Sequence, residues 1–204
     1  MELFKPGSIC IISSSTYFPK MPTMHAIELP HSANCLVCGR HNPHGLKLRL
    51  HVLPESGLVS TEFIPQDEHV GFEGIVHGGL LATILDEAMT WAATWRNKRF
   101  CYCGELTARF RFPVRPRDAL RIEAQVEFSK PKLVEVASKI FDFTGRLMAT
   151  GSGKYVPTGV DEHRAFLRTF LSDPNTEPAA RLLRGEHVPV ISPVEPDVPE
   201  PQPT

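Results

Sequence analysis

The stretch from Gly71 to Trp95 constrains the fold more than any other part of the chain. It reads GFEGIVHGGLLATILDEAMTWAATW, a glycine-rich turn followed by a mostly apolar segment. Eleven of the sixteen residues from Leu80 to Trp95 are apolar, and they lie all around the helical wheel instead of on one stripe. This distribution is typical of a buried helix. We therefore predict one long helix enclosed by protein, because the segment is too short and too charged to span a membrane.

The predicted helix begins at three consecutive residues, His77, Gly78 and Gly79. Backbone N–H groups at a helix start have no partner within the helix, and the helix dipole is positive there, so a carbonyl or oxyanion can bind. Glycine lets such a ligand approach closely. Asp86 follows His77 by nine positions, about two and a half turns into the helix. An acid is unfavourable in an apolar helix, so Asp86 is either held by structural hydrogen bonds or serves a substrate.

Alternating apolar residues predict strands on both sides of this helix. Two strands precede it as a hairpin and four follow it, near residues 46–52, 59–63, 106–112, 120–128, 134–140 and 147–156. A curved antiparallel sheet wrapped around one long central helix buries both kinds of element economically. The fold class predicted is therefore α+β.

The chain divides into three predicted segments. Residues 1–33 lack a sustained period and contain four prolines, which predicts a flexible leader. Residues 34–157 form the predicted folded domain. Residues 158–204 are expected to form a short helix near 161–170 and then a disordered tail, because eight prolines occur from Ser172 onward.

The composition argues against several classes of partner. The formal net charge is −1, with basic and acidic residues interspersed, so we expect neither a nucleic-acid partner nor attachment to a membrane. The chain contains five cysteines, an odd number, and shows no clear export signal. These features are typical of a reducing compartment, so we expect a cytoplasmic protein without a disulfide.

Cysteine and histidine residues raise the question of a metal site. The candidate ligands, of which the first four recur every three residues, are Cys35, Cys38, His41, His44, Cys101 and Cys103. Four ligands within ten residues would need a tight knuckle, whereas Pro43 and Gly45 favour an ordinary turn into a strand. We therefore predict no metal site, and we expect no cofactor.

The sequence VHGGLLATILDEA, residues 76–88, resembles the signature of the hotdog-fold acyl-CoA thioesterases of the PaaI and THEM4-like group. The sequence CLVCGRHNPHGLKL, residues 35–48, also resembles the start of many members, and together the matches cover roughly residues 34–157. The resemblance implies the hotdog fold and an enzyme that hydrolyses an acyl-CoA thioester to the free acid and coenzyme A. It also implies a homodimer or homotetramer with the active site between subunits.

The resemblance assigns roles to the helix motif. Asp86 is the general base or the nucleophile, and both routes stay open. The Gly78 N–H polarises the thioester carbonyl, while His77 either positions the loop or contacts the thioester. Relatives often carry a polar residue, commonly Asn, a few residues before the His-Gly-Gly motif, at a place near Gly71. Glycine has no side chain that could hold a water molecule there.

Further candidates for substrate contact come from the resemblance and from the charge pattern. They are Gly79, His69, Glu73, Cys103, Thr107, Arg115, Arg117 and Lys132. His69 and Glu73 are the polar residues nearest to Gly71. Cys103 and Thr107 lie where relatives contribute a Ser or Thr from the partner subunit. The three basic residues lie in turns between late strands, where they could meet the phosphates of coenzyme A at an open rim.

Two other functions stay open. One is a non-catalytic acyl-CoA or acyl-carrier binding protein, which the glycine at position 71 favours. The other is a hotdog dehydratase or hydratase, which usually shows an Asp and His pair in a motif that we do not find here. Asp86 favours the hydrolase over both.

Overall fold

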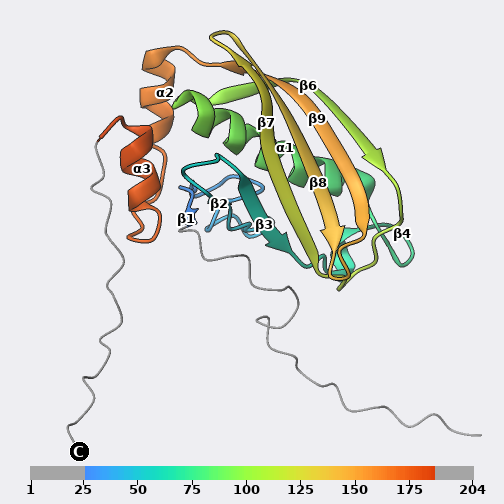
Figure 1. The fold of residues 1–204 in the computed structure, drawn as a ribbon. Helices are drawn as coiled ribbons and strands as arrows, with labels where there is room; N and C mark the ends of the chain where they lie inside the picture. Colours follow the sequence, from blue (N-terminus) through green and yellow to red (C-terminus); the bar gives the residue numbers. More distant parts are fainter. Residues whose placement is uncertain (1–25, 187–204) are drawn as a thin grey trace, which may run out of the picture.

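The computed structural model describes residues 26–186, which form a curved antiparallel sheet wrapped around one long helix (Figure 1). The seven strands, in the spatial order β1-β2-β3-β7-β8-β9-β6, are β1 (Ile27–Glu28), β2 (His51–Val52), β3 (Val59–Phe63), β7 (Leu120–Lys130), β8 (Leu133–Asp142), β9 (Leu147–Pro157) and β6 (Cys101–Phe110). The predicted α+β hotdog architecture is confirmed.

The central helix, α1 (Gly78–Asn97), is buried by the sheet on most of its surface. Ten of its residues are buried, including Leu85 and Met89. A Cβ atom at Gly151 of β9 would lie 3.1 Å from the Met89 side chain, so the lack of a side chain there lets helix and sheet approach closely. No helix within residues 26–186, α1 included, has the length and apolar character needed to cross a membrane.

Strands β7, β8 and β9 show the predicted alternation along most of their length. Strand β6 does not, because nearly all of its residues are exposed, including Leu106 and Phe110. The first predicted strand is much shorter than expected. Only His51–Val52 pairs as β2, although Leu48 and Leu50 are buried as the alternation predicts. Lys47 has a positive φ of 54°, which interrupts an extended conformation. The backbone N–H of Leu48 donates to the carbonyl of Val37, so this stretch pairs with the N-terminal turn instead of with a strand.

The folded part extends beyond residues 34–157 in both directions. Strand β1 lies within the segment expected to be a leader, and the following Leu29 is only 2% exposed. Besides the expected short helix, α2 (Val160–Leu167), a further helix, α3 (Glu177–Leu183), lies where disorder was predicted. Pro178 occupies its first turn, where proline is tolerated because the missing N–H has no helical partner. The other residues of the predicted leader and tail, 1–25 and 187–204, lie outside the described residues.

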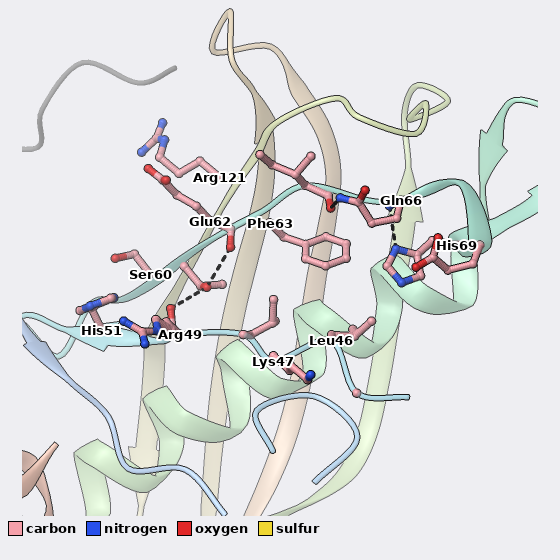
Figure 2. Close-up of a pocket in the computed structure, with 15 residues that line it drawn as sticks. Leu46, Lys47, Arg49, His51, Ser60, Glu62, Phe63, Gln66, His69 and Arg121 are labelled. Atoms are coloured by element: carbon pink, nitrogen blue, oxygen red, sulfur yellow. Dashed lines mark hydrogen bonds between the residues drawn. The ribbon is translucent and has the colours of Figure 1, made fainter. Parts of the chain in front are cut away.

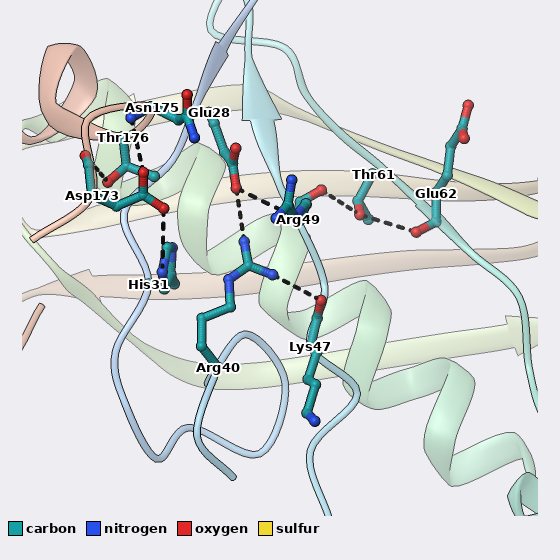
Figure 3. Close-up of polar contacts among 10 residues, drawn as sticks. All are labelled: Glu28, His31, Arg40, Lys47, Arg49, Thr61, Glu62, Asp173, Asn175 and Thr176. Carbon is teal, nitrogen blue, oxygen red and sulfur yellow. Dashed lines mark hydrogen bonds and ion pairs between the residues drawn. The ribbon is translucent and has the colours of Figure 1, made fainter. Parts of the chain in front are cut away.

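Polar contacts join both terminal segments to the sheet (Figure 3). The Arg40 guanidinium donates to Glu28 of β1 at 2.7 Å and to the Lys47 carbonyl at 3.2 Å. His31 lies 3.8 Å from the carboxylate of Asp173, which precedes α3. The Arg40 and Glu28 side chains are 19% and 10% exposed, so solvent screens this ion pair less than a surface pair.

The position of α3 leads to a stability prediction. Leu183 is 2% exposed and belongs to the hydrophobic core, so Leu183→Ala is expected to lower the free energy of unfolding by about 2–4 kcal/mol. Leu36→Ala is the matched control, because Leu36 is 55% exposed, and should change it by less than about 0.5 kcal/mol. Urea denaturation measures both. Equal effects of the two substitutions would show that α3 does not stabilise the domain.

Candidate active site

The start of α1 is held by His77, which is the N-cap residue of the helix. Its Nδ1 accepts a hydrogen bond from the Gly79 N–H at 2.9 Å, and its own N–H donates to the His69 carbonyl at 2.9 Å. A Cβ atom at Gly79 would lie 2.8 Å from that Nδ1, so the cap requires glycine here. His77 therefore positions the helix start.

The Gly78 N–H is an available donor at this helix start. It has no hydrogen-bond acceptor within residues 26–186, whereas the N–H groups of Leu80 and Leu81 donate to the His77 carbonyl. Gly78 and His77 line a hollow of about 350 Å³ whose apolar walls include Phe72, Ile75, Leu81, Phe110 and Phe112. A carbonyl oxygen entering this hollow would meet the Gly78 N–H and the positive end of the helix dipole.

Gly71 packs directly against His77. A Cβ atom at Gly71 would lie 2.8 Å from the His77 ring, so that ring fills the space in which a side chain at position 71 would begin. Glu73 is exposed in the turn between β4 (Val70–Phe72) and β5 (Ile75–Val76). Glu73 does not line the hollow, and Gly71 lines it without a side chain, so neither residue places a polar side chain there.

His69 belongs to a different and larger hollow of about 740 Å³ (Figure 2). Its Nδ1 accepts from the Gln66 N–H at 2.9 Å, and its ring packs on Phe63 with centroids 5.5 Å apart. Segments 45–49 and 60–64 form much of the wall. This hollow contains neither the helix start nor Asp86, so the His69 side chain does not face the predicted site.

Asp86 lies on α1 at the face directed toward β6 and β9. Its carboxylate is half-buried and accepts a hydrogen bond from the Tyr155 hydroxyl at 2.8 Å. Tyr155 is fully buried, and burial together with the Asp86 charge raises its pKa, so the hydroxyl remains a hydrogen-bond donor. Partial burial and a hydrogen bond to Asp86 raise the pKa of Cys103 to about 11. Cys103 therefore lies near Asp86 of its own chain.

The sequence analysis missed Tyr155. Strand alternation gave a usable signal, because Tyr155 shares the inner face of β9 with Gly151 and Gly153. A tyrosine on that face needs a partner for its hydroxyl, and an acid of the enclosed helix is the natural acceptor.

Gly78 and Asp86 lie too far apart to act on one carbonyl within one chain. They are eight residues apart along α1, which corresponds to about 12 Å. A carbonyl bound at Gly78 is therefore beyond the reach of the Asp86 carboxylate of the same chain.

The basic candidates lie at two ends of the molecule. Arg115 and Arg117 precede β7, and Lys132 follows it; this strand has 11 residues, which corresponds to about 35 Å. Lys132 therefore cannot bind the same phosphates as the two arginines in one chain. Arg117 pairs with Asp67 at 2.7 Å in an exposed position. Arg111, which the sequence analysis did not select, lines the hollow at Gly78. Thr107 is exposed on the edge strand β6.

Glu87 is directed away from Asp86, as their positions on the helical wheel predict. Its carboxylate accepts from the Trp91 indole N–H at 3.1 Å and lies beside the thiols of Cys35 and Cys38. Burial raises the pKa of Glu87 to about 7, and the charge of Cys35 contributes to this rise. Glu87 is therefore not part of the Asp86 cluster.

The raised pKa of Glu87 leads to a prediction of pH dependence. The pKa rises from 4.5 to about 7 on folding, so ionisation destabilises the fold increasingly from pH 4.5 to pH 7, by up to about 3 kcal/mol. Glu87→Gln removes this effect and should raise the free energy of unfolding relative to wild type above pH 7, with no gain below pH 4.5. Denaturation in buffer with a metal chelator measures it. The exposed Glu73→Gln is the control, and a gain independent of pH would contradict the prediction.

Residues 73–149 match the family model of the thioesterase superfamily. A search of curated proteins found no match. Over residues 73–149 the chain is thus similar to the thioesterase superfamily, and the predicted resemblance to PaaI-like thioesterases is confirmed.

Solved structures show the same fold at low sequence identity. A thioesterase superfamily protein is 22% identical with a TM-score of 0.56, over 60% of this chain and 63% of that protein. This chain therefore spans less than two thirds of the length of that relative. The Escherichia coli PaaI protein from the phenylacetic acid degradation operon is 19% identical with a TM-score of 0.51, over 56% and 81%. A variant of PaaI from Thermus thermophilus is 18% identical with a TM-score of 0.51, over 55% and 95%.

Proposed function

We propose that the protein is an acyl-CoA thioesterase, with Asp86 as general base or nucleophile and the Gly78 N–H as the donor that stabilises the oxyanion. The observation that carries this proposal is the Asp86 carboxylate, half-buried in an apolar helix and held by the buried Tyr155 hydroxyl. The same helix begins with a free N–H at an apolar hollow, among the residues that the structure describes.

Two routes fit this arrangement. As a base, Asp86 accepts a proton from water while the water oxygen attacks the carbonyl carbon; the C–S bond then breaks and the coenzyme A thiolate takes a proton. As a nucleophile, the carboxylate forms an anhydride and expels the thiolate, and water then hydrolyses the anhydride. In both routes the Gly78 N–H stabilises the negative oxygen, and Tyr155 orients the Asp86 carboxylate.

The separation of about 12 Å between Gly78 and Asp86 within one chain supports a site shared between two copies. A second copy with its helix antiparallel to the first would bring its Asp86 to this Gly78. The sheet offers a surface for such a contact, because β6 is an edge strand and nine of its ten residues are not buried. Phe72 and Phe110, which line the hollow, are 79% and 52% exposed. A homodimer would cover them; a homotetramer built from two such dimers is an equally suitable assembly.

The polarity of the hollow supports an acyl-CoA substrate. Its aromatic and aliphatic walls suit an acyl chain, while Arg111 at its edge, with Arg115 and Arg117 beyond β6, suits phosphate groups. All four cysteines of residues 26–186 are free thiols, which supports the cytoplasmic location that we propose.

Release of free thiol from short, medium, long and aromatic acyl-CoAs tests the reaction. Asp86→Asn keeps the shape of the side chain but removes the base, so kcat is expected to fall roughly 10²–10⁴-fold with little change in substrate affinity. Asp161→Asn is the control, because the Asp161 side chain is fully exposed, and should leave kcat unchanged. Activity that survives in Asp86→Asn would remove Asp86 from the reaction.

Mixed subunits test whether two copies share the site. Gly78→Pro removes the N–H at the first helical position, where proline is tolerated, and the extended φ and ψ of His77 suit a following proline. Alone, this variant and Asp86→Asn should each be inactive. Co-refolded in equal amounts, they should recover about a quarter of wild-type activity, because each mixed dimer contains one intact site. No recovery, despite mixed dimers in native mass spectrometry, would place the whole site in one chain.

A binding protein without turnover is the alternative, and Gly71 favours it. No side chain at that position can hold a water molecule, because the His77 ring occupies the space. Saturable acyl-CoA binding without thiol release from any member of the panel would establish this alternative.

A further inference from the structure

Three side chains of the kinds that bind metals converge on a side of α1 that the proposed reaction does not use. The sulfur atoms of Cys35 and Cys38 and a carboxylate oxygen of Glu87 all lie within 4.8 Å of one another. Within the described part of the chain, no other three Cys, His, Asp or Glu side chains come together in this way. Cys38 is buried, and Cys35 and Glu87 are half-buried. We call these three residues, Cys35, Cys38 and Glu87, the thiol cluster.

The turn that carries both cysteines is tightly built. The Val37 N–H donates to the Cys35 sulfur at 3.3 Å, and the Gly39 N–H donates to the Cys35 carbonyl at 3.1 Å. A Cβ atom at Gly39 would lie 2.3 Å from that carbonyl oxygen, so only glycine allows the chain to fold back here. An N–H group directed at sulfur favours the thiolate, which is the form that binds metal.

The sequence favoured an ordinary turn at Pro43 and Gly45, and the Gly45 N–H donates to the Asn42 carbonyl at 3.2 Å there. The Cys-x-x-Cys spacing is common in zinc sites, and the knuckle that it requires is present at residues 35–39. The two histidines considered with it, His41 and His44, are exposed and do not belong to the thiol cluster. The third ligand comes instead from α1, far away in the sequence.

Glu87 is an acid without a cation. It takes part in no ion pair within residues 26–186, although its side chain is enclosed between the cysteine turn and the Trp91 indole. A half-buried carboxylate beside two thiols is unfavourable when ionised unless a positive charge offsets it. The Trp91 N–H orients one carboxylate oxygen at 3.1 Å, as groups behind a metal ligand commonly do.

We propose that the thiol cluster is a binding site for a divalent, thiol-preferring cation, and that Zn²⁺ occupies it with a water molecule as the fourth ligand. Two sulfur atoms and one oxygen suit Zn²⁺ better than Mg²⁺ or Ca²⁺, which prefer oxygen alone. Water reaches the cluster beside Cys35, which is only partly buried. The ion would connect the turn at residues 35–39 to the central helix. The N–H groups of Leu46 and Leu48 donate to the carbonyls of Leu36 and Val37, so the ion would also hold this part of the wall of the larger hollow in place.

Metal titration of the full chain tests this site. Protein stripped of metal and kept reduced is titrated with Co²⁺ and Zn²⁺; one Co²⁺ per chain should bind with a sulfur-to-cobalt charge-transfer band, and Zn²⁺ should displace it. Zn²⁺ should also raise the Tm. In Cys38→Ser the band should be lost, and in Glu87→Gln the affinity should fall at least about tenfold. Cys101→Ser is the matched control, because Cys101 is buried but lies outside the thiol cluster, and should bind as wild type does.

The titration of the wild-type chain tests the metal site even if Cys38→Ser fails to fold. A reduced, folded wild-type chain that gives no charge-transfer band and no rise in Tm would overturn the proposal. Retention of full affinity in Glu87→Gln would exclude the carboxylate as a ligand and overturn the site as described. Cys35 and Cys38 could instead be isolated as a disulfide. If reduction of this disulfide gave a chain without metal affinity, the two cysteines would be a redox pair, and the proposal of a metal site would be overturned.

Discussion

The close contact between α1 and the curved sheet is the constraint on which the rest of the structure depends. A helix that is apolar on nearly all sides must be covered, and a sheet can cover it only if its inner face approaches the helix closely. Gly151 of β9 provides that approach opposite Leu85 and Met89. The same approach places Tyr155 against Asp86, so the packing that buries the helix also creates the environment of the proposed catalytic acid.

The two adjacent acids of α1 show how one helix can present two chemistries. Asp86 faces β6 and β9, at the exposed edge of the sheet, while Glu87 faces the cysteine turn and Trp91. Consecutive helical residues point about 100° apart, so each acid meets a different set of neighbours. One acid therefore lies toward the exposed edge of the sheet, and the other lies beside two thiols.

The sequence predicted the fold well where the signal was periodic. The helix and strands β7, β8 and β9 follow directly from apolar spacing, because burial on one face produces it, whereas the apolar residues of β6 alternate along a strand that is largely exposed. Strand β1 and helix α3 were not predicted, because β1 has only two residues and α3 lies in a proline-rich segment; their positions depend on contacts such as Arg40 with Glu28. The site was predicted in part: His77, Gly78 and Asp86 lie at the start of α1 and along it as expected, whereas Tyr155 and the partners of Glu87 come from distant segments that no local pattern connects to the helix.

The contact between Gly71 and His77 also limits how this protein can change. Any side chain at position 71 would require the His77 ring to move, since a Cβ atom at Gly71 would lie 2.8 Å from that ring. A displaced ring would no longer accept the hydrogen bond from the Gly79 N–H that caps α1. The residue at position 71 and the cap of the central helix are therefore linked in this chain.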